Sequence, residues 1–157
     1  DYADDFLKAC GDDLETAKSI ANVSGIEVAF RTLVKKNEAI GIEEPFYYYV
    51  FNAEIPGWDN PGTFHSVDLW FFFENLAKCW RPFKGKHMDL ARNMCNYWAN
   101  FFRTGDPNGP DNDGTPMPLW KPYTTAEPNA VWFNDVVEAC VDKPSEAMNV
   151  LVERNSK

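Results

Sequence analysis

The sequence predicts an α/β fold. Two helical patterns come first, over residues 11–25 and 26–41, and a strand buried on both faces follows them over residues 46–51. A loop with two Pro-Gly pairs, residues 55–62, then leaves the carboxyl end of that strand. Helix, helix and fully buried strand in this order are typical of an α/β sheet and not of a helical bundle or a β-sandwich.

The first two helices are predicted from capping residues and from hydrophobic spacing. Asp12 can cap the first helix, Glu15 stands three residues later, and Gly25 would end it. The second helix has an apolar stripe at positions i, i+4, i+7 and i+8, and Gly41 would end it. The stripe consists of Ile26, Phe30, Leu33 and Val34.

The strand is predicted from composition rather than from alternation. All residues from Phe46 to Phe51 are aromatic or β-branched, as expected of a strand that is covered on both faces. In open α/β sheets, ligands and catalytic loops gather at the carboxyl ends of the strands. His65, which lies in or just beyond the Pro-Gly loop, is therefore expected at such an edge.

The most regular helix is predicted within residues 87–109, with Gly105 as its C-terminal cap. A turn-rich surface segment follows over residues 105–118, then a short strand within residues 129–135 and a last helix that starts at Pro144. The apolar stripe of the long helix is predicted to consist of Ala91, Met94, Cys95, Trp98, Phe101 and Phe102.

Length and charge bound the possible functions. The chain has 157 residues, 45% of them hydrophobic, which fits one domain or a large piece of one. A net charge of −9 argues against nucleic acid and anionic membranes as partners. The sequence contains no apolar run near the roughly 18 residues of a membrane span. Because the chain begins without Met, we expect a processed or excised segment, and the sequence leaves its compartment open between cytoplasmic and secreted.

Metal and nucleotide sites are not predicted. The sequence has two histidines and no C-x-x-C pair, whereas a zinc site needs clustered ligands. It also has no glycine-rich phosphate loop. The cysteines could form two disulfides or remain four thiols, and their spacing leaves both open. They are Cys10, Cys79, Cys95 and Cys140.

His65 is the candidate general base, because the pKa of a histidine lies near neutral pH. Hydrolysis would also require a nucleophile and an orienting acid. No serine stands in a G-x-S-x-G motif, and Ser66 adjoins His65 too closely for proton transfer. From the residues alone, a structural role is therefore favoured for His65. Similarly, His87 is interpreted as a surface or capping residue, and Asp68 as a group that holds the loop through backbone hydrogen bonds.

Three consecutive motifs change that interpretation. "GTFHSVDLWFFFENL", "NYWANFFRTGDPNG" and "PLWKPYT" resemble, in order and spacing, the C-terminal third of type-B carboxylesterases, the family of the cholinesterases and the bacterial para-nitrobenzyl esterases. The match runs from about Pro45 to Tyr123, and His65 falls on the catalytic histidine of the family's motif. Asp68 stands where the family commonly has Glu, and the run Phe71–Phe73 is unusually bulky.

The resemblance implies that residues 1–157 are the C-terminal third of an α/β-hydrolase domain, a mostly parallel sheet flanked by helices that is incomplete on its own. It implies a serine carboxylesterase that hydrolyses small-molecule esters without a metal or organic cofactor. The serine, the oxyanion-hole region and the acid would lie on an N-terminal part outside this chain, and the enzyme would be active only together with that part. Asp12, Asp13 and Glu15 match no acid motif.

Two other interpretations remain open from the sequence. Carboxylesterase-like domains also serve as non-catalytic binding or adhesion modules, and the deciding serine is not in this chain. The chain could also be an independent small domain. However, a strand buried on both faces needs sheet neighbours that the sequence scarcely provides.

Overall fold

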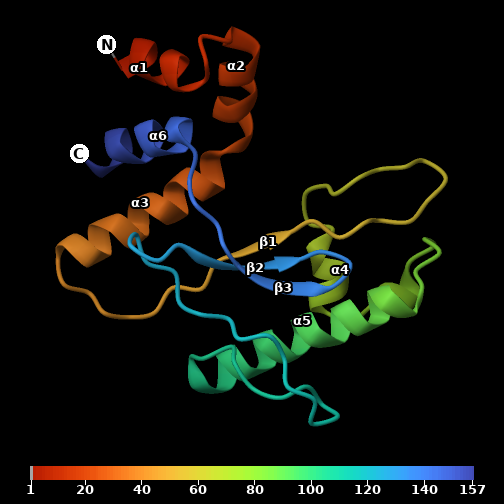
Figure 1. The fold of residues 1–157 in the computed structure, drawn as a ribbon. Helices are drawn as coiled ribbons and strands as arrows, with labels where there is room; N and C mark the ends of the chain where they lie inside the picture. Colours follow the sequence, from red (N-terminus) through yellow and green to blue (C-terminus); the bar gives the residue numbers. More distant parts are fainter. Residues whose placement is uncertain (1) are drawn as a thin grey trace. The chain divides into compact units, whose positions relative to one another are not determined.

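In the computed structural model, which describes residues 2–157, the chain forms two compact units (Figure 1). Unit 1 contains the residues up to Phe46, residues 123–128 and the residues from Val141 onward. Unit 2 contains residues 47–122 and 129–140. His65 therefore belongs to unit 2.

Unit 1 is helical. Its helices are α1 (Tyr2–Ala9), α2 (Leu14–Val23), α3 (Gly25–Ala39) and α6 (Glu146–Ser156). Helix α6 packs against both α1 and α3 (Figure 1). A small apolar core lies among these helices and consists of Phe6, Cys10, Ala17, Ala147 and Leu151.

The helix ends in unit 1 depart by a few residues from those predicted. Asp13, not Asp12, caps α2, since its carboxylate accepts hydrogen bonds from the amide of Glu15 at 3.0 Å and the hydroxyl of Thr16 at 2.7 Å. Asp12 instead has a φ of +59° in the connecting turn. Gly25, predicted to end α2, begins α3, and helix α1 was not predicted at all.

The predicted apolar stripe of α3 is only partly correct. Val34 is buried, but Ile26 is 81% exposed and Leu33 is 49% exposed. The buried face of α3 is formed instead by Arg31, Thr32 and Val34. Because α6 covers that face, the position of α6 decides which residues of α3 are buried, and hydrophobic spacing within α3 does not reveal it.

A buried arginine on α3 connects the segments of unit 1. The side chain of Arg31 is 3% exposed and forms an ion pair with Asp142 at 2.6 Å and with Glu27 at 2.8 Å. It also donates hydrogen bonds to the hydroxyl of Tyr123 at 2.6 Å and to the carbonyl of Asp142 at 3.2 Å. Tyr123 in turn forms a β-bridge with Phe46. Arg31 therefore holds together segments from the beginning, middle and end of the chain.

Unit 2 contains the sheet, whose strands lie in the order β1 (Tyr49–Phe51), β2 (Asn129–Phe133) and β3 (Val137–Val141). Strands β1 and β2 are parallel, with Tyr49 opposite Val131. The predicted late strand is thus confirmed as β2, whereas β1 covers only the second half of the predicted range 46–51. Strand β3 was not predicted.

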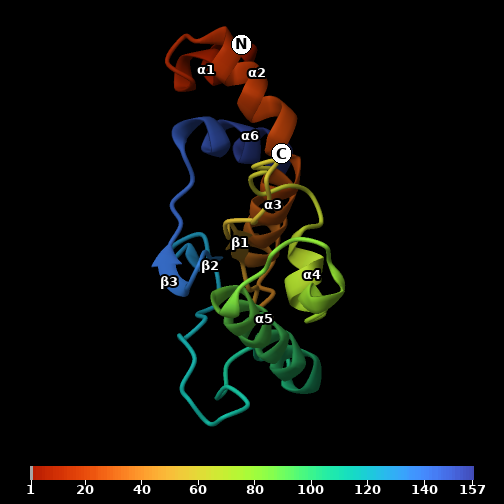
Figure 2. The ribbon, with the colours of Figure 1, turned by 90° about the vertical axis from the view of Figure 1, so that its right-hand side faces the viewer.

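Helices α4 (Asp68–Phe72) and α5 (Gly85–Thr104) pack against each other (Figure 2). A 3-10 helix, η1 (Leu76–Lys78), lies between them in the sequence. The predicted cap of α5 is confirmed, because Gly105 has a φ of +78° and its amide donates to the carbonyl of Phe101. The core of unit 2 includes Ile55, Val67, Phe71, Leu76, Leu90, Ala91, Met94, Tyr97, Trp120, Val131 and Phe133.

The buried face of α5 is displaced from the predicted stripe. Ala91 and Met94 are fully buried as predicted, but Phe101 is 42% exposed and Phe102 is 73% exposed. Leu90 and Tyr97 fill the core in their place. The last turn of α5 therefore presents aromatic side chains to solvent.

The structure also shows the state of the cysteines and tests the helices for membrane-spanning character. All four cysteines are free thiols, and among them only Cys10 is buried. No helix within residues 2–157 has the length and apolar character needed to cross a membrane.

Replacing Arg31 by Met should destabilise unit 1. The substitution leaves Asp142 and Tyr123 without their cationic partner, and breaking such a pair typically costs about 3 kcal/mol. Urea denaturation of the protein would measure the loss. The control is Lys18→Met on α2, whose ion pair with Glu15 is exposed, so that the expected change is below about 1 kcal/mol. Equal changes for both variants would contradict a stabilising role of Arg31.

Candidate functional site

His65 lies on a turn between the loop that leaves β1 and the start of α4. Its side chain is exposed, and it forms no hydrogen bond or ion pair within residues 2–157. The turn is closed by hydrogen bonds from the amide of Val67 to the carbonyl of Phe64 and from the amide of Leu69 to the carbonyl of Ser66, each 3.2 Å long. The imidazole is thus presented to solvent on a turn that follows β1 in the chain.

The residue after His65 has an unusual backbone conformation. Ser66 has a φ of +66°, in the left-handed region that non-glycine residues seldom adopt. Such residues cluster at functional sites, where the surrounding structure holds them in place. The strained turn is therefore consistent with a functional His65.

Core residues anchor the loop at both ends. Ala53 and Ile55 are 1% and 3% exposed on one side, and Val67 is 1% exposed on the other. In addition, the hydroxyl of Thr63 donates to the carbonyl of Ala53 at 3.2 Å and so closes the base of the loop. Between these anchors the loop, including His65, is exposed.

Asp68 connects the turn to the sheet through a side chain rather than through the backbone. We expected its carboxylate to hold the loop by backbone hydrogen bonds, but it accepts a hydrogen bond from the hydroxyl of Tyr49 on β1 at 2.9 Å. Burial, followed by the nearby charge of Asp68, raises the pKa of Tyr49, so the phenol remains a donor. The pair fixes the first turn of α4 against β1.

Arg81 forms a second set of contacts with the loop, and sequence reasoning missed it. Its guanidinium donates to both carboxylate oxygens of Asp59, each at 2.9 Å, and to the carbonyl of Pro56 at 3.1 Å. The hydrogen bonds of this pair lower the pKa of Asp59 and raise the pKa of Arg81, so both remain charged. A single arginine between Trp80 and Pro82 follows no periodic pattern that would have indicated this contact.

His87 is buried at the start of α5. It was expected to be a surface or capping residue, and the capping role is confirmed because its Nδ1 accepts a hydrogen bond from the amide of Lys84 at 2.8 Å. The surface position was wrong, since His87 is 3% exposed and packs against the rings of Phe71 and Phe83. His87 is therefore part of the start of α5.

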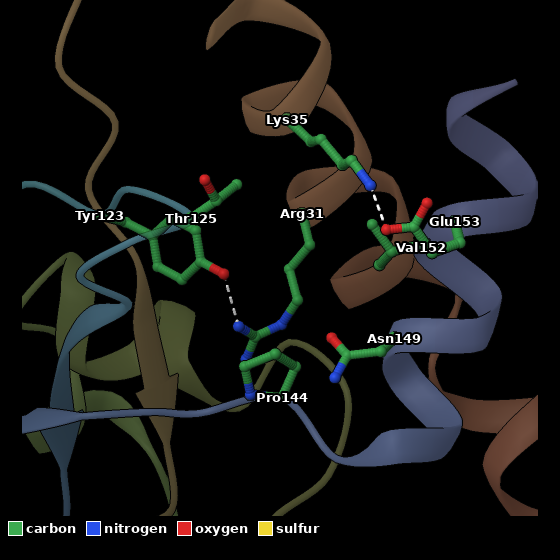
Figure 3. Close-up of a pocket in the computed structure, with 8 residues that line it drawn as sticks. All are labelled: Arg31, Lys35, Tyr123, Thr125, Pro144, Asn149, Val152 and Glu153. Carbon is green, nitrogen blue, oxygen red and sulfur yellow. Dashed lines mark hydrogen bonds and ion pairs between the residues drawn. The ribbon is translucent and has the colours of Figure 1, made fainter. Parts of the chain in front are cut away.

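Unit 1 contains a cavity of about 290 Å³, drawn in Figure 3. Its charged side chains contact other lining residues: the guanidinium of Arg31 points to Tyr123, and Lys35 forms an ion pair with Glu153 (Figure 3). No predicted site residue lines it. The charged side chains of the cavity thus form their contacts within unit 1.

Residues 2–157 contain no group of three or more His, Cys, Asp or Glu side chains that could hold a metal ion. What the site offers is a single exposed imidazole on an anchored loop. An imidazole in that position can accept and return a proton, but it needs a partner nucleophile to do so.

A profile of the carboxylesterase family matches residues 13–148, which is most of the chain and includes the loop with His65. The chain belongs to the carboxylesterase family. The resemblance seen in the sequence is thereby confirmed.

Individual relatives of this carboxylesterase chain agree with the assignment. Acetylcholinesterase of Gallus gallus is 36% identical over 83 residues, which is 50% of this chain and 10% of that protein. Carboxylesterase 5A of Felis catus is 58% identical over 38 residues, 24% of this chain and 6% of that protein. The carboxylesterase chain therefore spans a small fraction of the relatives it matches.

Solved structures confirm the fold class. The Geobacillus stearothermophilus carboxylesterase EST55 at pH 6.2 superimposes with a TM-score of 0.63 and covers 94% of this chain and 31% of its own, at 21% identity. The same enzyme at pH 6.8 gives a TM-score of 0.51 and 29% identity over 66% of this chain and 21% of its own. The carboxylesterase chain thus has the fold of part of an α/β-hydrolase.

Replacing His87 should remove a pH dependence of stability. Burial, and then the charge of Lys86, lowers the pKa of His87 below its ordinary value of about 6.5. Below that pH the unfolded chain binds more protons than the folded chain, so stability falls as the pH falls towards the folded pKa, by at most about 1.4 kcal/mol per pH unit. Urea denaturation of wild type and His87→Gln at several pH values between 7.5 and 5 would measure the free energy of unfolding. Equal slopes of this free energy against pH in the two proteins would contradict the prediction.

Removing the hydroxyl of Tyr49 should loosen α4 from β1. Tyr49→Phe keeps the ring contacts with Trp98 and Phe133 but deprives the Asp68 carboxylate of its donor, which should cost about 1.5 kcal/mol. Urea denaturation would measure the loss. In an Asp68→Asn background the same substitution should cost less, because the charge-assisted bond is already absent. An unchanged cost in that background would show that the pair is not the cause.

Proposed function

We propose that this chain is the C-terminal portion of a serine carboxylic ester hydrolase and that it supplies the catalytic histidine, His65. The observation that carries the proposal is the exposed imidazole on an anchored turn beyond the carboxyl end of β1, within the region that matches the carboxylesterase family. Catalytic residues of open α/β sheets lie at this edge. The substrates are small-molecule carboxylic esters.

In the proposed mechanism His65 moves protons in two half-reactions. It accepts the proton of a serine hydroxyl as the serine oxygen attacks the ester carbonyl, and it then protonates the departing alcohol, which leaves an acyl-enzyme. In the second half it accepts a proton from water, which attacks the acyl group, and returns that proton to the serine as the acid leaves. An acidic side chain would hold the other ring nitrogen of His65.

The serine and the acid are proposed to lie on the N-terminal part of the same enzyme. This chain covers between 6% and 31% of the compared relatives and structures, and none of its serines stands in a G-x-S-x-G motif. In carboxylesterase-type α/β-hydrolases the order along the chain is serine, acid, histidine. Residues 1–157 would therefore be the last third of a single α/β-hydrolase domain.

Two features of unit 2 support such a partner. Within the described residues β1 is an edge strand, so its outer backbone groups are available to a further strand. Large aromatic side chains are also exposed, among them Trp58 at 90%, Phe73 at 64% and Trp80 at 64%. Exposed apolar surface of this kind marks an interface, and the remainder of the hydrolase domain would cover it.

Replacing His65 should abolish ester hydrolysis by the complete enzyme. With its N-terminal part, the enzyme should hydrolyse para-nitrophenyl acetate, and His65→Ala should lower kcat by about three orders of magnitude or more because the serine loses its base. The 157-residue chain alone should give no turnover. Lys121→Ala, which truncates an exposed side chain of unit 2, is the control and should keep its activity.

A His65→Ala enzyme with a rate within threefold of wild type would exclude the proposed role. The residue at the nucleophile position of the N-terminal part distinguishes an enzyme from a non-catalytic binding module. If the residue of the N-terminal part at the nucleophile position is not a serine in a G-x-S-x-G motif, the chain belongs to a binding or adhesion protein instead.

A further inference from the structure

The shape of the His65 loop depends on side chains rather than on secondary structure. Residues 52–64 form no helix or strand. The core residues Ala53, Ile55 and Val67 hold its ends, but most of the excursion between Ile55 and Val67 is exposed. A loop of this kind needs contacts from elsewhere in the fold if it is to present one side chain in a constant position.

Arg81 provides those contacts from the segment that joins η1 to α5. Its side chain is only 7% exposed. The two parallel hydrogen bonds to Asp59 and the bond to the carbonyl of Pro56 attach it to two points of the loop. A bidentate guanidinium–carboxylate pair fixes orientation as well as distance, so it constrains the loop more than a single contact would.

The loop backbone approaches this pair closely at Gly57. A Cβ atom on Gly57 would lie 2.4 Å from Nη1 of Arg81 and 2.4 Å from Oδ1 of Asp59. Any other residue would have to displace the guanidinium or the carboxylate. Gly57 therefore allows the chain to fold over Arg81.

Arg81 also reaches the residue directly before His65. The ring centre of Phe64 lies 5.8 Å from the guanidinium carbon of Arg81, and it lies 5.9 Å from the ring centre of Trp70 on α4. Phe64 is thus held by a cation–π contact and an edge-to-face ring contact. With Val67 buried two residues later, His65 lies between a residue in contact with Arg81 and a residue of the core.

We propose that Arg81 is a positioning residue for His65, which it places by holding Pro56, Asp59 and Phe64 of the loop. This inference rests on the proposed function of His65. Arg81 does not touch the reacting atoms. It keeps the imidazole in the place where the serine of the N-terminal part meets it.

The expected size of the effect follows from the geometry of proton transfer. A displacement of about 1 Å in a catalytic group can cost about 100-fold in rate. Lysine has a single ammonium group and cannot form the two parallel bonds of the guanidinium. Arg81→Lys should therefore behave more like a loss of Arg81 than like a conservative change.

The test uses the complete enzyme with para-nitrophenyl acetate. Arg81→Met should lower kcat by about 10- to 100-fold, because the loop is released, while KM changes less than about threefold. The matched control is Arg103→Met, since within the described residues 2–157 Arg103 donates hydrogen bonds only to Ala99 and Asn100 of its own helix. The control should keep kcat within about twofold of wild type.

Three further measurements separate positioning from general stability. Guanidinium ions at tens of millimolar, far below denaturing concentrations, should restore part of the kcat of Arg81→Ala. Asp59→Asn should lower kcat, as Arg81→Met does. The double variant, Arg81→Met with Asp59→Asn, should have a kcat little lower than that of Arg81→Met alone, because both substitutions remove the same contact between Arg81 and Asp59.

The possible failures are distinguishable. If His65→Ala abolishes turnover while Arg81→Met matches Arg103→Met in kcat, the inference about Arg81 is wrong and the proposed function stands. If His65→Ala remains active, the proposed function fails, and the inference fails with it. If Arg81→Met does not fold, Asp59→Asn decides: a kcat equal to that of the control overturns the inference.

Discussion

The burial of one indole ring, that of Trp120, is the interaction on which unit 2 depends. Trp120 is 2% exposed, and its ring centre lies 5.4 Å from that of Tyr97, 5.5 Å from that of Trp98 and 5.8 Å from that of Phe133. The indole N–H donates to the carbonyl of Tyr48 at 3.1 Å, so no polar atom of the ring is left unpaired. This ring joins α5, β2 and the segment before β1 into one core.

The turn-rich segment before Trp120 is held by the same residue. The side-chain amide of Asn108 donates to the carbonyl of Trp120 at 2.9 Å and accepts from its amide at 2.7 Å. The segment therefore closes against the core although it contains no helix or regular strand. Because β1 is set by this packing, and the His65 loop leaves its carboxyl end, the position of the imidazole depends indirectly on the burial of Trp120.

The proposed division of a catalytic triad between chain segments would leave a single catalytic group, His65, in this chain. His65 is exposed and has no partner within residues 2–157, yet its turn is anchored by Val67, by the pair Tyr49–Asp68 and by the contacts of Arg81. A side chain that served only the core would be buried, as His87 is. This contrast between the two histidines supports the proposed role of His65.

The sequence by itself determined the family, the α/β class, the C-terminal cap of α5 at Gly105 and the strand β2, because motif order, a capping glycine and a short apolar run between turns are local properties. Only the tertiary structure decided which faces of α3 and α5 are buried. Ile26 and Phe102 fit the helical period but lie in solvent, since the position of the packing partner selects the buried face. The contact of Arg81 with Asp59 was likewise invisible in the sequence, because it joins residues 22 positions apart through a loop without any repeating pattern.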